Sequence, residues 1–441
     1  MKTSRIEAFF MGENRKNKVK RVTLMNQERS VNELVKQLIM PLLSAIGLSL
    51  LLGIPIGIVI SLFKRILSLA NQFRSHHEYL VYGLPVAGVL ISYLYVKAGR
   101  NAYSGENLLK SEVLQASKDI PVYMVLVVFL GSLLTTFFGG SAGKEAAGIA
   151  MGGTVADLIA RHLKLSEEKQ RTLVVSGVGS GFGVLYDVPL AGAILGMELV
   201  LKGKFHYEAL IPAFVSSVVA NQVAYLMGDH PIEYPILDLG VFSIALIVKL
   251  MGLGILFGLV SMLFNFCLNS APKIYSYFMK SPMIKGVVGG CLTIVLFWMA
   301  GDNYNGLGQS FIATSFEKSV SLVEFLWKII FTAVALGSVF QGGRGNPTFF
   351  VGATFGSAIA PLFNLEVSSV AALGMIGVFG GAASLPLTGI VMAVEYFGTN
   401  EVLPIILVMT ITYLISGLYD VISTQKLPKG KNDVFQANIT D

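Results

Sequence analysis

Two stretches of the sequence repeat each other and decide the fold. Residues 177–198 read GVGSGFGVLYDVPLAGAILGME, and residues 374–395 read GMIGVFGGAASLPLTGIVMAVE. The residues of the first stretch that recur 197 positions later are Gly177, Phe182, Gly183, Pro189, Leu190, Gly192 and Glu198. In both copies a glutamate follows the proline by nine residues (Glu198 and Glu395). Gly- and Pro-broken segments in matching places predict two homologous halves in inverted topology that meet near the middle of a membrane.

The composition indicates a polytopic membrane protein. Of the 441 residues, 54% are hydrophobic and 14% are charged, whereas about a quarter of a soluble domain is charged. The mean hydropathy is +0.67. These values exclude an ordinary soluble globule, a disordered chain and a fibrous one. Several hydrophobic runs are too short to span a bilayer, and several end at Gly or Pro, so we expect an all-α fold of broken, tilted helices in contact with membrane lipid.

Positive charge gathers at the two ends of the chain. The first 36 residues hold nine Lys and Arg against four acids, and the tail after Thr424 adds Lys426, Lys429 and Lys431. Beside a membrane domain, such charge indicates the cytoplasmic side rather than a nucleic-acid partner. We therefore expect a multi-pass protein of the cell membrane with both termini in the cytoplasm. The expected organisation is a basic N-terminal segment at 1–37, membrane repeats at 38–230 and 231–422, and a short tail at 423–441 without a regulatory domain.

The sequence predicts no metal site and no cofactor. Its five histidines form no HExxH motif, and the two cysteines, Cys267 and Cys291, lie in apolar runs without a Cys/His ligand spacing. Small buried side chains explain both cysteines.

Three glycine-rich segments are candidates for an anion site: residues 103–109 (YSGENLL), 139–148 (GGSAGKEAAG) and 341–350 (QGGRGNPTFF). Glycines before a helix let backbone N–H groups converge, and a helix N-terminus carries about half a positive charge. Any one segment is as well explained by close helix packing, but three in a chain of two repeats indicate an anion pathway. The glycine pairs suggest that Gly139–Gly140 corresponds to Gly342–Gly343.

Glu145 is the candidate gate of that pathway. It lies between Gly143 and the start of an apolar helix, and an ionisable residue within the hydrocarbon zone is functional by default. A salt bridge to Lys144 is the alternative, although adjacent helical residues do not face each other. A carboxylate at an anion site competes with the anion for the same N–H groups. Since it can also be protonated and leave, it can serve as both gate and proton carrier.

These motifs resemble those of the CLC family of anion channels and transporters. Residues 143–145 look like the family's glycine–basic–glutamate gate, residues 342–347 resemble its second anion loop, and residues 105–109 fall where it has its first. The segment 189–192 resembles its helix after the gate, and the resemblance extends from about residue 40 to 422.

The resemblance implies a transport protein rather than an enzyme. It implies the inverted-repeat fold, a homodimer with one pore per subunit, and Glu145 as the external gate. It also implies a pore tyrosine, at Tyr419, whose hydroxyl donates to the anion. The residues expected to bind the anion are Gly105, Glu106, Asn107, Gly143, Lys144, Arg344, Gly345 and Tyr419.

The departures from the family pattern bear on the transported anion. The family's gate motif usually continues with Gly, where this chain has Ala146. The usual chloride members carry Ser where Glu106 stands, and their proton-coupled members have a relay acid where Leu199 stands. The 105–109 segment is closer to the fluoride-exporting branch, although that branch usually has an acid at the position of Arg344. We expect fluoride export coupled to proton entry. A chloride channel or a weakly coupled chloride transporter of the same family is the alternative.

An enzyme is the alternative from a different class. Tyr186–Asp187 together with Gly228–Asp229 faintly resembles the aspartate pair of an intramembrane protease, but the second site lacks the extra glycine expected there. Asp187 is better explained as a residue in a loop or at a helix end.

Overall fold

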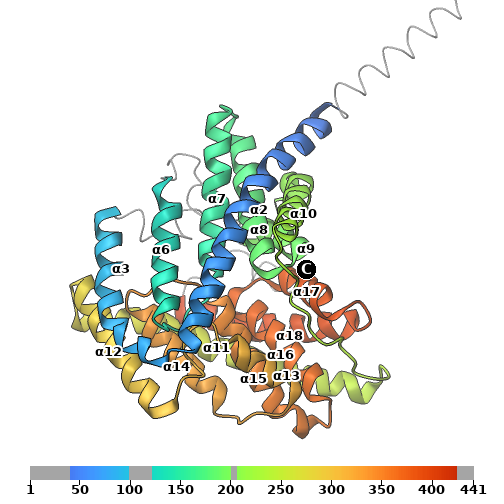
Figure 1. The fold of residues 1–441 in the computed structure, drawn as a ribbon. Helices are drawn as coiled ribbons and strands as arrows, with labels where there is room; N and C mark the ends of the chain where they lie inside the picture. Colours follow the sequence, from blue (N-terminus) through green and yellow to red (C-terminus); the bar gives the residue numbers. More distant parts are fainter. Residues whose placement is uncertain (1–39, 99–121, 200–205, 425–441) are drawn as a thin grey trace, which may run out of the picture. The chain divides into compact units, whose positions relative to one another are not determined.

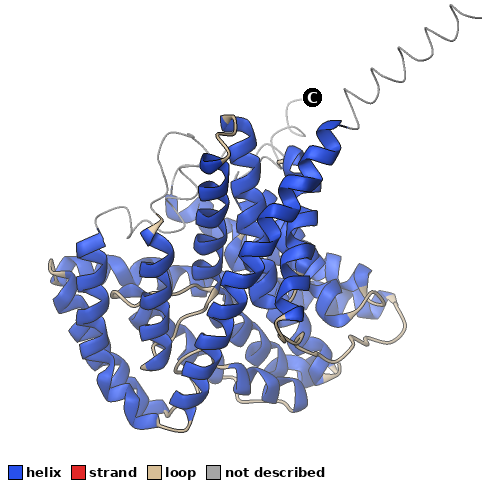
Figure 2. Cartoon of the chain, turned by 45° about the horizontal axis from the view of Figure 1, so that its top comes forward, coloured by secondary structure: helices blue, strands red, loops and turns tan. Residues whose placement is uncertain are grey.

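Helices make up the regular structure of the chain. The computed structural model describes residues 40–98, 122–199 and 206–424, and every helix or strand element assigned in these ranges is a helix (Figure 1, Figure 2). Two compact units are distinguished, Met1–Leu48 and Ser49–Asp441, and the arrangement below is that of the second. The all-α prediction is confirmed.

The helices keep the labels of Figure 1. Those of the first half are α2 (Met40–Ser75), α3 (Leu84–Ala98), α6 (Tyr123–Phe137), α7 (Glu145–His162), α8 (Glu167–Tyr186), α9 (Pro189–Leu199) and α10 (Leu210–Leu226). Those of the second half are α11 (Ile244–Phe278), α12 (Pro282–Ala300), α13 (Gln309–Glu317), α14 (Glu324–Gly337), α15 (Gly345–Phe363), α16 (Val367–Ala383), α17 (Pro386–Phe397) and α18 (Val402–Thr424). Short 3₁₀ turns cover Glu78–Gly83 and Tyr207–Ala209.

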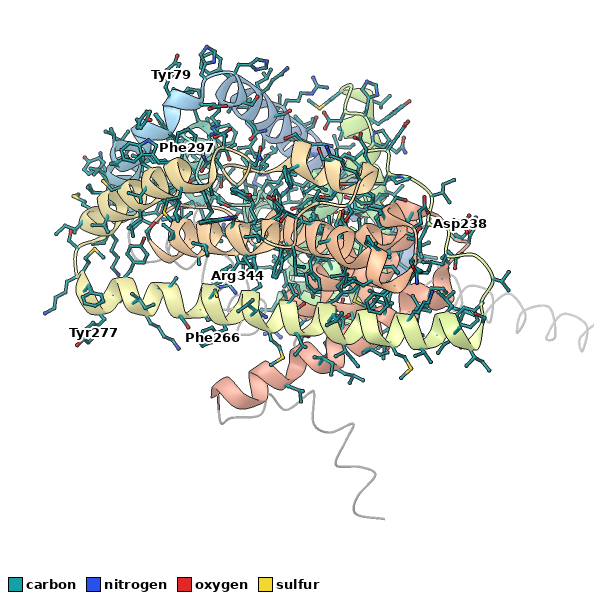
Figure 3. All side chains as sticks on the ribbon, turned by 90° about the horizontal axis from the view of Figure 1, so that it is seen from below. Tyr79, Asp238, Phe266, Tyr277, Phe297 and Arg344 are labelled. Carbon is teal, nitrogen blue, oxygen red and sulfur yellow. The ribbon has the colours of Figure 1, made fainter. Side chains whose placement is uncertain are left out.

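Helix lengths are as unequal as the broken hydrophobic runs predict. By length and composition, the segments able to cross a membrane are Leu42–Ser75, Glu78–Lys97, Tyr207–Leu226, Ile244–Phe278 and Pro282–Ala300. α11 has 35 residues, about 52 Å at 1.5 Å per residue, which exceeds a hydrocarbon core of about 30 Å and requires a tilt. Its outer face carries exposed apolar side chains such as Phe266 and Tyr277 (Figure 3), which a bilayer would cover.

Each half contains a helix pair packed through glycines. α7 lies along α8, and α15 lies along α16 (Figure 1). A Cβ at Gly152 would overlap the carbonyl oxygen of Gly177, and a Cβ at Gly352 would overlap that of Gly374. Because neither contact leaves room for a side chain, glycine is required for the helix axes to approach this closely.

The structure corrects the register of the glycine-rich segments. α7 begins at Glu145 and α15 at Gly345, a spacing of 200 residues. Pairing Gly139–Gly140 with Gly342–Gly343, a spacing of 203, is therefore wrong. A shared Gly–Gly pair does not fix the register, because glycines recur throughout these closely packed helices. Further along the chain, α8 has 20 residues and α16 has 17, so the spacing falls from 200 to 197 before the α9 and α17 prolines.

The two halves are inverted with respect to each other. Gly143 and Gly343 form an antiparallel bridge in which each N–H donates to the other's carbonyl at 2.8 Å. Equivalent residues also stack on each other, since the rings of Phe182 and Phe379 lie 6.1 Å apart with an interplanar angle of 19°. Equivalent residues touch only at a symmetry axis, so a pseudo-two-fold axis passes through this region. The predicted inverted repeat is confirmed.

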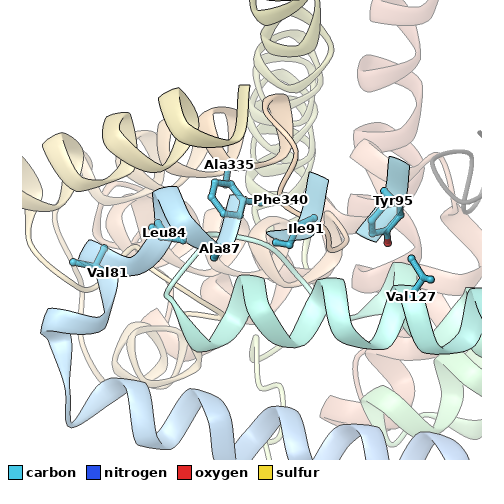
Figure 4. Close-up of a cluster of buried hydrophobic side chains, with 8 residues drawn as sticks. All are labelled: Val81, Leu84, Ala87, Ile91, Tyr95, Val127, Ala335 and Phe340. Carbon is cyan, nitrogen blue, oxygen red and sulfur yellow. The ribbon is translucent and has the colours of Figure 1, made fainter. Parts of the chain in front are cut away.

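An apolar cluster next to this axis supports the loop that precedes α15. It joins the segment around α3 to α6, α14 and the chain just before residue 341 (Figure 4). Its buried members are Val81, Leu84, Ala87, Ile91, Tyr95, Val127, Ala335 and Phe340. Tyr95 and Phe340 also line the cavity described below, so this cluster fixes one wall of the candidate site.

Candidate functional site

The Glu145 carboxylate lies at the N-terminus of the helix from the other half. Glu145 is 7% exposed and is the first residue of α7. Its Oε1 accepts a hydrogen bond from the N–H of Gly345, the first residue of α15. A Cβ at Gly343 would overlap Oε1, so the carboxylate fills space that only glycine leaves open. The bridge between the halves thus brings the carboxylate of one repeat to the positive end of a helix in the other.

A buried tyrosine holds the second carboxylate oxygen. The Tyr186 hydroxyl lies 2.9 Å from Oε2 of Glu145 and 2.8 Å from Oδ1 of Asn346. In the part of the chain that the structure describes, the Gly345 N–H and the Tyr186 hydroxyl both donate to this carboxylate, as they would to a bound anion.

Lys144 does not pair with Glu145. Its side chain is 4% exposed, and its ammonium lies 5.1 Å from the ring centroid of Tyr186. Among the described residues, no oxygen accepts a hydrogen bond from the Lys144 ammonium. The ammonium does interact electrostatically with Glu145, Asp187 and Asp229, and with the like charge of Lys64. A buried cation therefore stands beside the gate, on the face of Tyr186.

Arg344 is the equivalent of Lys144 in the second half and has a different environment. Each residue directly precedes its helix, yet Arg344 is exposed and its Nη2 donates to Oδ1 of Asn269 at 3.3 Å. Figure 3 shows Arg344 near α11. Arg344 lines a cavity, whereas Lys144 packs on Tyr186.

That cavity reaches the gate. Its volume is about 630 Å³, and Glu145, Arg344, Glu198 and Asn265 are among its polar lining residues. Phe182 and Phe379 line it too, so it extends to the pseudo-two-fold axis. Glu145 thus borders the cavity and also contacts the Tyr186 hydroxyl.

A charged cluster beyond Lys144 brings together the two aspartates of the protease alternative. The ammonium of Lys64 lies 2.5 Å from Oδ1 of Asp187 and 3.9 Å from Oδ2 of Asp229. Nε of Arg65 donates to Oδ1 of Asp229 at 3.1 Å. Both carboxylates are therefore counter-ions of basic residues on α2. Asp187 follows the end of α8 with φ 59°, as expected for a residue at a helix end.

Some expected ligands lie outside what the structure describes. Gly105, Glu106 and Asn107 fall in residues 99–121, and the side chain of Tyr419 is likewise outside the described part, although its backbone belongs to α18. Gly143, Lys144, Arg344 and Gly345 all lie at the Gly143–Gly343 bridge or directly after it. In the described residues no group of three His, Cys, Asp or Glu is placed to hold a metal ion.

Two residues of the site were not predicted as such. In the sequence, Tyr186 stands out only beside Asp187, and Asn346 only as part of a glycine-rich segment. Tyr186 lies at the end of α8, 41 residues from Glu145, and Asn346 lies 160 residues from Tyr186. No spacing within one sequence connects residues so far apart. The one sequence signal for Tyr186 and for Asn346 was that each is a polar residue beside a repeat motif.

Comparison with known proteins identifies the family of the chain. The family model described as voltage gated chloride channel matches residues 87–417, which is 331 of the 441 residues. The chain belongs to the CLC family. Membership confirms the expected anion transporter with multiple membrane passes and shows that the protein is not an enzyme, so the protease alternative is wrong.

Relatives of this CLC protein differ in the anion that their names give. A chloride/fluoride channel protein of Pseudomonas syringae pv. tomato is 33% identical over 395 residues, 88% of this chain and 87% of its own. The H(+)/Cl(-) exchange transporter ClcA of Vibrio cholerae is 27% identical over 399 residues, 82% of this chain and 84% of its own. The crystal structure of a CLC-type fluoride/proton antiporter matches with a TM-score of 0.82 at 32% identity, covering 86% of this chain and 96% of that one.

Proposed function

We propose that this CLC protein exports fluoride in exchange for protons and that Glu145 is its gate and proton carrier. The observation that carries the proposal is the Glu145 carboxylate itself, held by the Gly345 N–H and the Tyr186 hydroxyl at the start of α15. A carboxylate bound by donors alone occupies the position that an anion would take. Gate and substrate therefore compete for one set of hydrogen-bond donors.

That competition couples the proton to the anion. Ionised Glu145 occupies the donors and closes the pathway. Protonation removes its charge, weakens the charge-assisted hydrogen bonds and releases the side chain, so an anion can take its place. When Glu145 loses its proton it returns and displaces the anion. Each cycle then moves an anion and a proton in opposite directions.

Fluoride is proposed as the substrate on two grounds. Two relatives above 30% identity, the Pseudomonas protein and the antiporter of known structure, carry fluoride in their names. In addition, the acid near the expected relay position is engaged elsewhere. The Glu198 carboxylate accepts from the N–H of Leu387 at 3.1 Å and from the N–H and hydroxyl of Thr388 at 2.9 and 2.7 Å, and Leu199 follows it. A relay carboxylate of the chloride exchangers therefore has no counterpart here.

Chloride transport is the second candidate, and Arg344 favours it. An exposed guanidinium on the cavity wall attracts small anions in general and reduces discrimination between them.

The finer assignments belong to the same proposal. They comprise a homodimer, both termini in the cytoplasm and the domain limits given above. The proposed anion ligands are Gly143, Lys144, Arg344, Gly345, Gly105, Glu106, Asn107 and Tyr419.

Reconstitution in liposomes tests the function. Vesicles loaded with fluoride or chloride are diluted into anion-free buffer, and anion efflux and proton uptake are recorded together. We expect fluoride efflux with proton uptake in the native chain, and efflux without coupled proton uptake in Glu145→Gln. Faster chloride than fluoride efflux would favour the second candidate. Coupled proton uptake that persists in Glu145→Gln would contradict the gate assignment.

A further inference from the structure

The hydroxyl of Tyr186 has one hydrogen and two acceptors. It lies 2.9 Å from Oε2 of Glu145 and 2.8 Å from Oδ1 of Asn346. A hydroxyl donates a single hydrogen, so one of these oxygens receives it at a time. An ionised carboxylate is the stronger acceptor. The acceptor therefore depends on whether Glu145 is ionised and in place.

The ring of Tyr186 is fixed by its neighbours, so its hydroxyl stays at the site when Glu145 leaves. Tyr186 is 2% exposed. Its ring centroid lies 4.8 Å from that of Phe182 and 5.2 Å from that of Phe349. The Lys144 ammonium lies 5.1 Å from the same centroid. None of these contacts involves the Glu145 carboxylate.

The backbone of Tyr186 is fixed as well. The hydroxyl of Tyr396 donates to the Tyr186 carbonyl at 2.7 Å. The next residue, Asp187, is bound to Lys64 at 2.5 Å. Because both ring and backbone are anchored, the hydroxyl is a preorganised donor, and an incoming ligand bears little cost of ordering it.

We infer that Tyr186 is a ligand of the transported anion. When protonated Glu145 leaves, the Tyr186 hydroxyl turns its hydrogen to the anion that replaces the carboxylate, and to Oδ1 of Asn346 when the position is empty. This inference rests on the proposed gate function of Glu145. Tyr186 belongs to α8, so it is distinct from Tyr419 of α18, for which the family resemblance implies a pore role.

A fixed hydroxyl donor also favours one halide over another. Fluoride is smaller than chloride and a stronger hydrogen-bond acceptor, so it gains more from a short O–H contact at a rigid position. A site built to donate a hydrogen bond discriminates by the strength of that bond. Tyr186 therefore contributes to fluoride selectivity.

Anion binding to purified variants, measured by isothermal titration calorimetry with sodium fluoride and sodium chloride, tests the inference. Glu145→Ala removes the competing carboxylate. The double variant Glu145→Ala with Tyr186→Phe is then compared with Glu145→Ala alone. We expect Tyr186→Phe to weaken fluoride binding about tenfold or more and chloride binding by less, since a donor to a charged acceptor is lost.

Tyr234→Phe is the matched control. The Tyr234 ring packs against Tyr396 and Phe397, and burial raises the pKa of its hydroxyl to about 12, so it too is a neutral phenol at the assay pH. We expect its removal to leave binding of both anions unchanged.

Two outcomes would overturn the inference. If Tyr186 serves only to hold Glu145, then Tyr186→Phe has no effect once Glu145→Ala has removed the carboxylate. Equal weakening of fluoride and chloride would remove the selectivity role. Both readouts are equilibrium binding, so they stay interpretable even if the liposome assay finds no exchange of fluoride for protons, which would count against the proposed function alone.

Asn346→Ala gives a second test if Tyr186→Phe does not fold. It keeps the tyrosine and removes the competing acceptor. In the Glu145→Ala background we expect fluoride to bind about threefold more tightly, because the Tyr186 hydroxyl no longer gives up a hydrogen bond to Asn346 when it binds the anion. Unchanged or weaker fluoride binding would contradict the inference.

Discussion

Glu198 and Glu395, which are 197 residues apart, each cap the helix that carries the other. The Glu198 carboxylate, near the end of α9, accepts from the first N–H groups of α17. The Glu395 carboxylate, near the end of α17, accepts from the N–H groups of Leu190 and Ala191 at 2.8 and 2.7 Å. Since each helix end lies at the other's start, α9 and α17 are antiparallel. The caps satisfy N–H groups that a helix N-terminus leaves without partners.

We predict that Glu198 stabilises the fold and is not required for proton coupling. Glu198→Ala leaves two backbone N–H groups of α17 unpaired and should lower the stability by about 2 kcal/mol. Glu395→Ala should cost a similar amount because its contacts are equivalent. Thermal unfolding in detergent measures the loss, and Glu208→Ala, at a carboxylate whose side chain is 63% exposed, is the control. Lost proton coupling at unchanged stability would identify Glu198 as a relay instead.

The sequence predicted the architecture because the features that set it are local or repeated. Hydrophobic composition, broken runs and the recurring Pro-to-Glu spacing are all visible without coordinates, and they led to an inverted helical repeat. Glu145 was predictable for the same reason, since a lone acid at the start of an apolar helix is conspicuous.

Features that depend on packing between the halves were not predictable. The register of the glycine-rich segments was wrong by three residues because Gly–Gly pairs recur in closely packed helices and do not fix an alignment. The spacing between the halves also changes along the chain, since α16 is three residues shorter than α8. Tyr186 and Asn346 were missed because their roles come from contacts across the interface. The capping roles of Glu198 and Glu395 were missed for the same reason.

A methyl group at Gly343 should open the gate. The Cβ of Gly343→Ala would overlap Oε1 of Glu145, and overpacking of this kind typically costs about 1–3 kcal/mol. The carboxylate should therefore occupy its position about tenfold less often, giving anion efflux with reduced proton coupling in liposomes. Gly252→Ala is the control, because its Cβ would lie 3.2 Å from the edge of the Phe363 ring, which can turn. Normal coupling in Gly343→Ala would show that the loop yields without moving Glu145.

We predict that Lys64 stabilises the end of α8, where Tyr186 lies, through its ion pair with Asp187. Lys64→Met leaves the Asp187 carboxylate without its 2.5 Å partner, whereas Asp229 keeps Arg65 at 3.1 Å. Removing one member of a mostly buried pair costs on the order of 3 kcal/mol. Thermal unfolding should show that loss, and the double variant Lys64→Met with Asp187→Asn should recover at least part of it. Lys273→Met, at an exposed lysine of α11, should be neutral. No recovery in the double variant would mean that Lys64 acts through packing rather than charge.

The antiparallel arrangement of α9 and α17 predicts that their ends face opposite sides of the membrane. Each glutamate lies nine residues past its proline, a rise of about 13 Å at 1.5 Å per residue, which is less than half of a core of about 30 Å. Because each glutamate caps the start of the other helix, α9 and α17 cross the same layer, about 13 Å thick, in opposite directions. In a chain whose Cys267 and Cys291 are first replaced by serine, Leu199→Cys and Thr399→Cys should react with an impermeant maleimide from opposite sides, and a permeant maleimide should label both. In a parallel duplication the two positions would be labelled from the same side. That result would contradict the antiparallel arrangement of α9 and α17 and with it the inverted repeat.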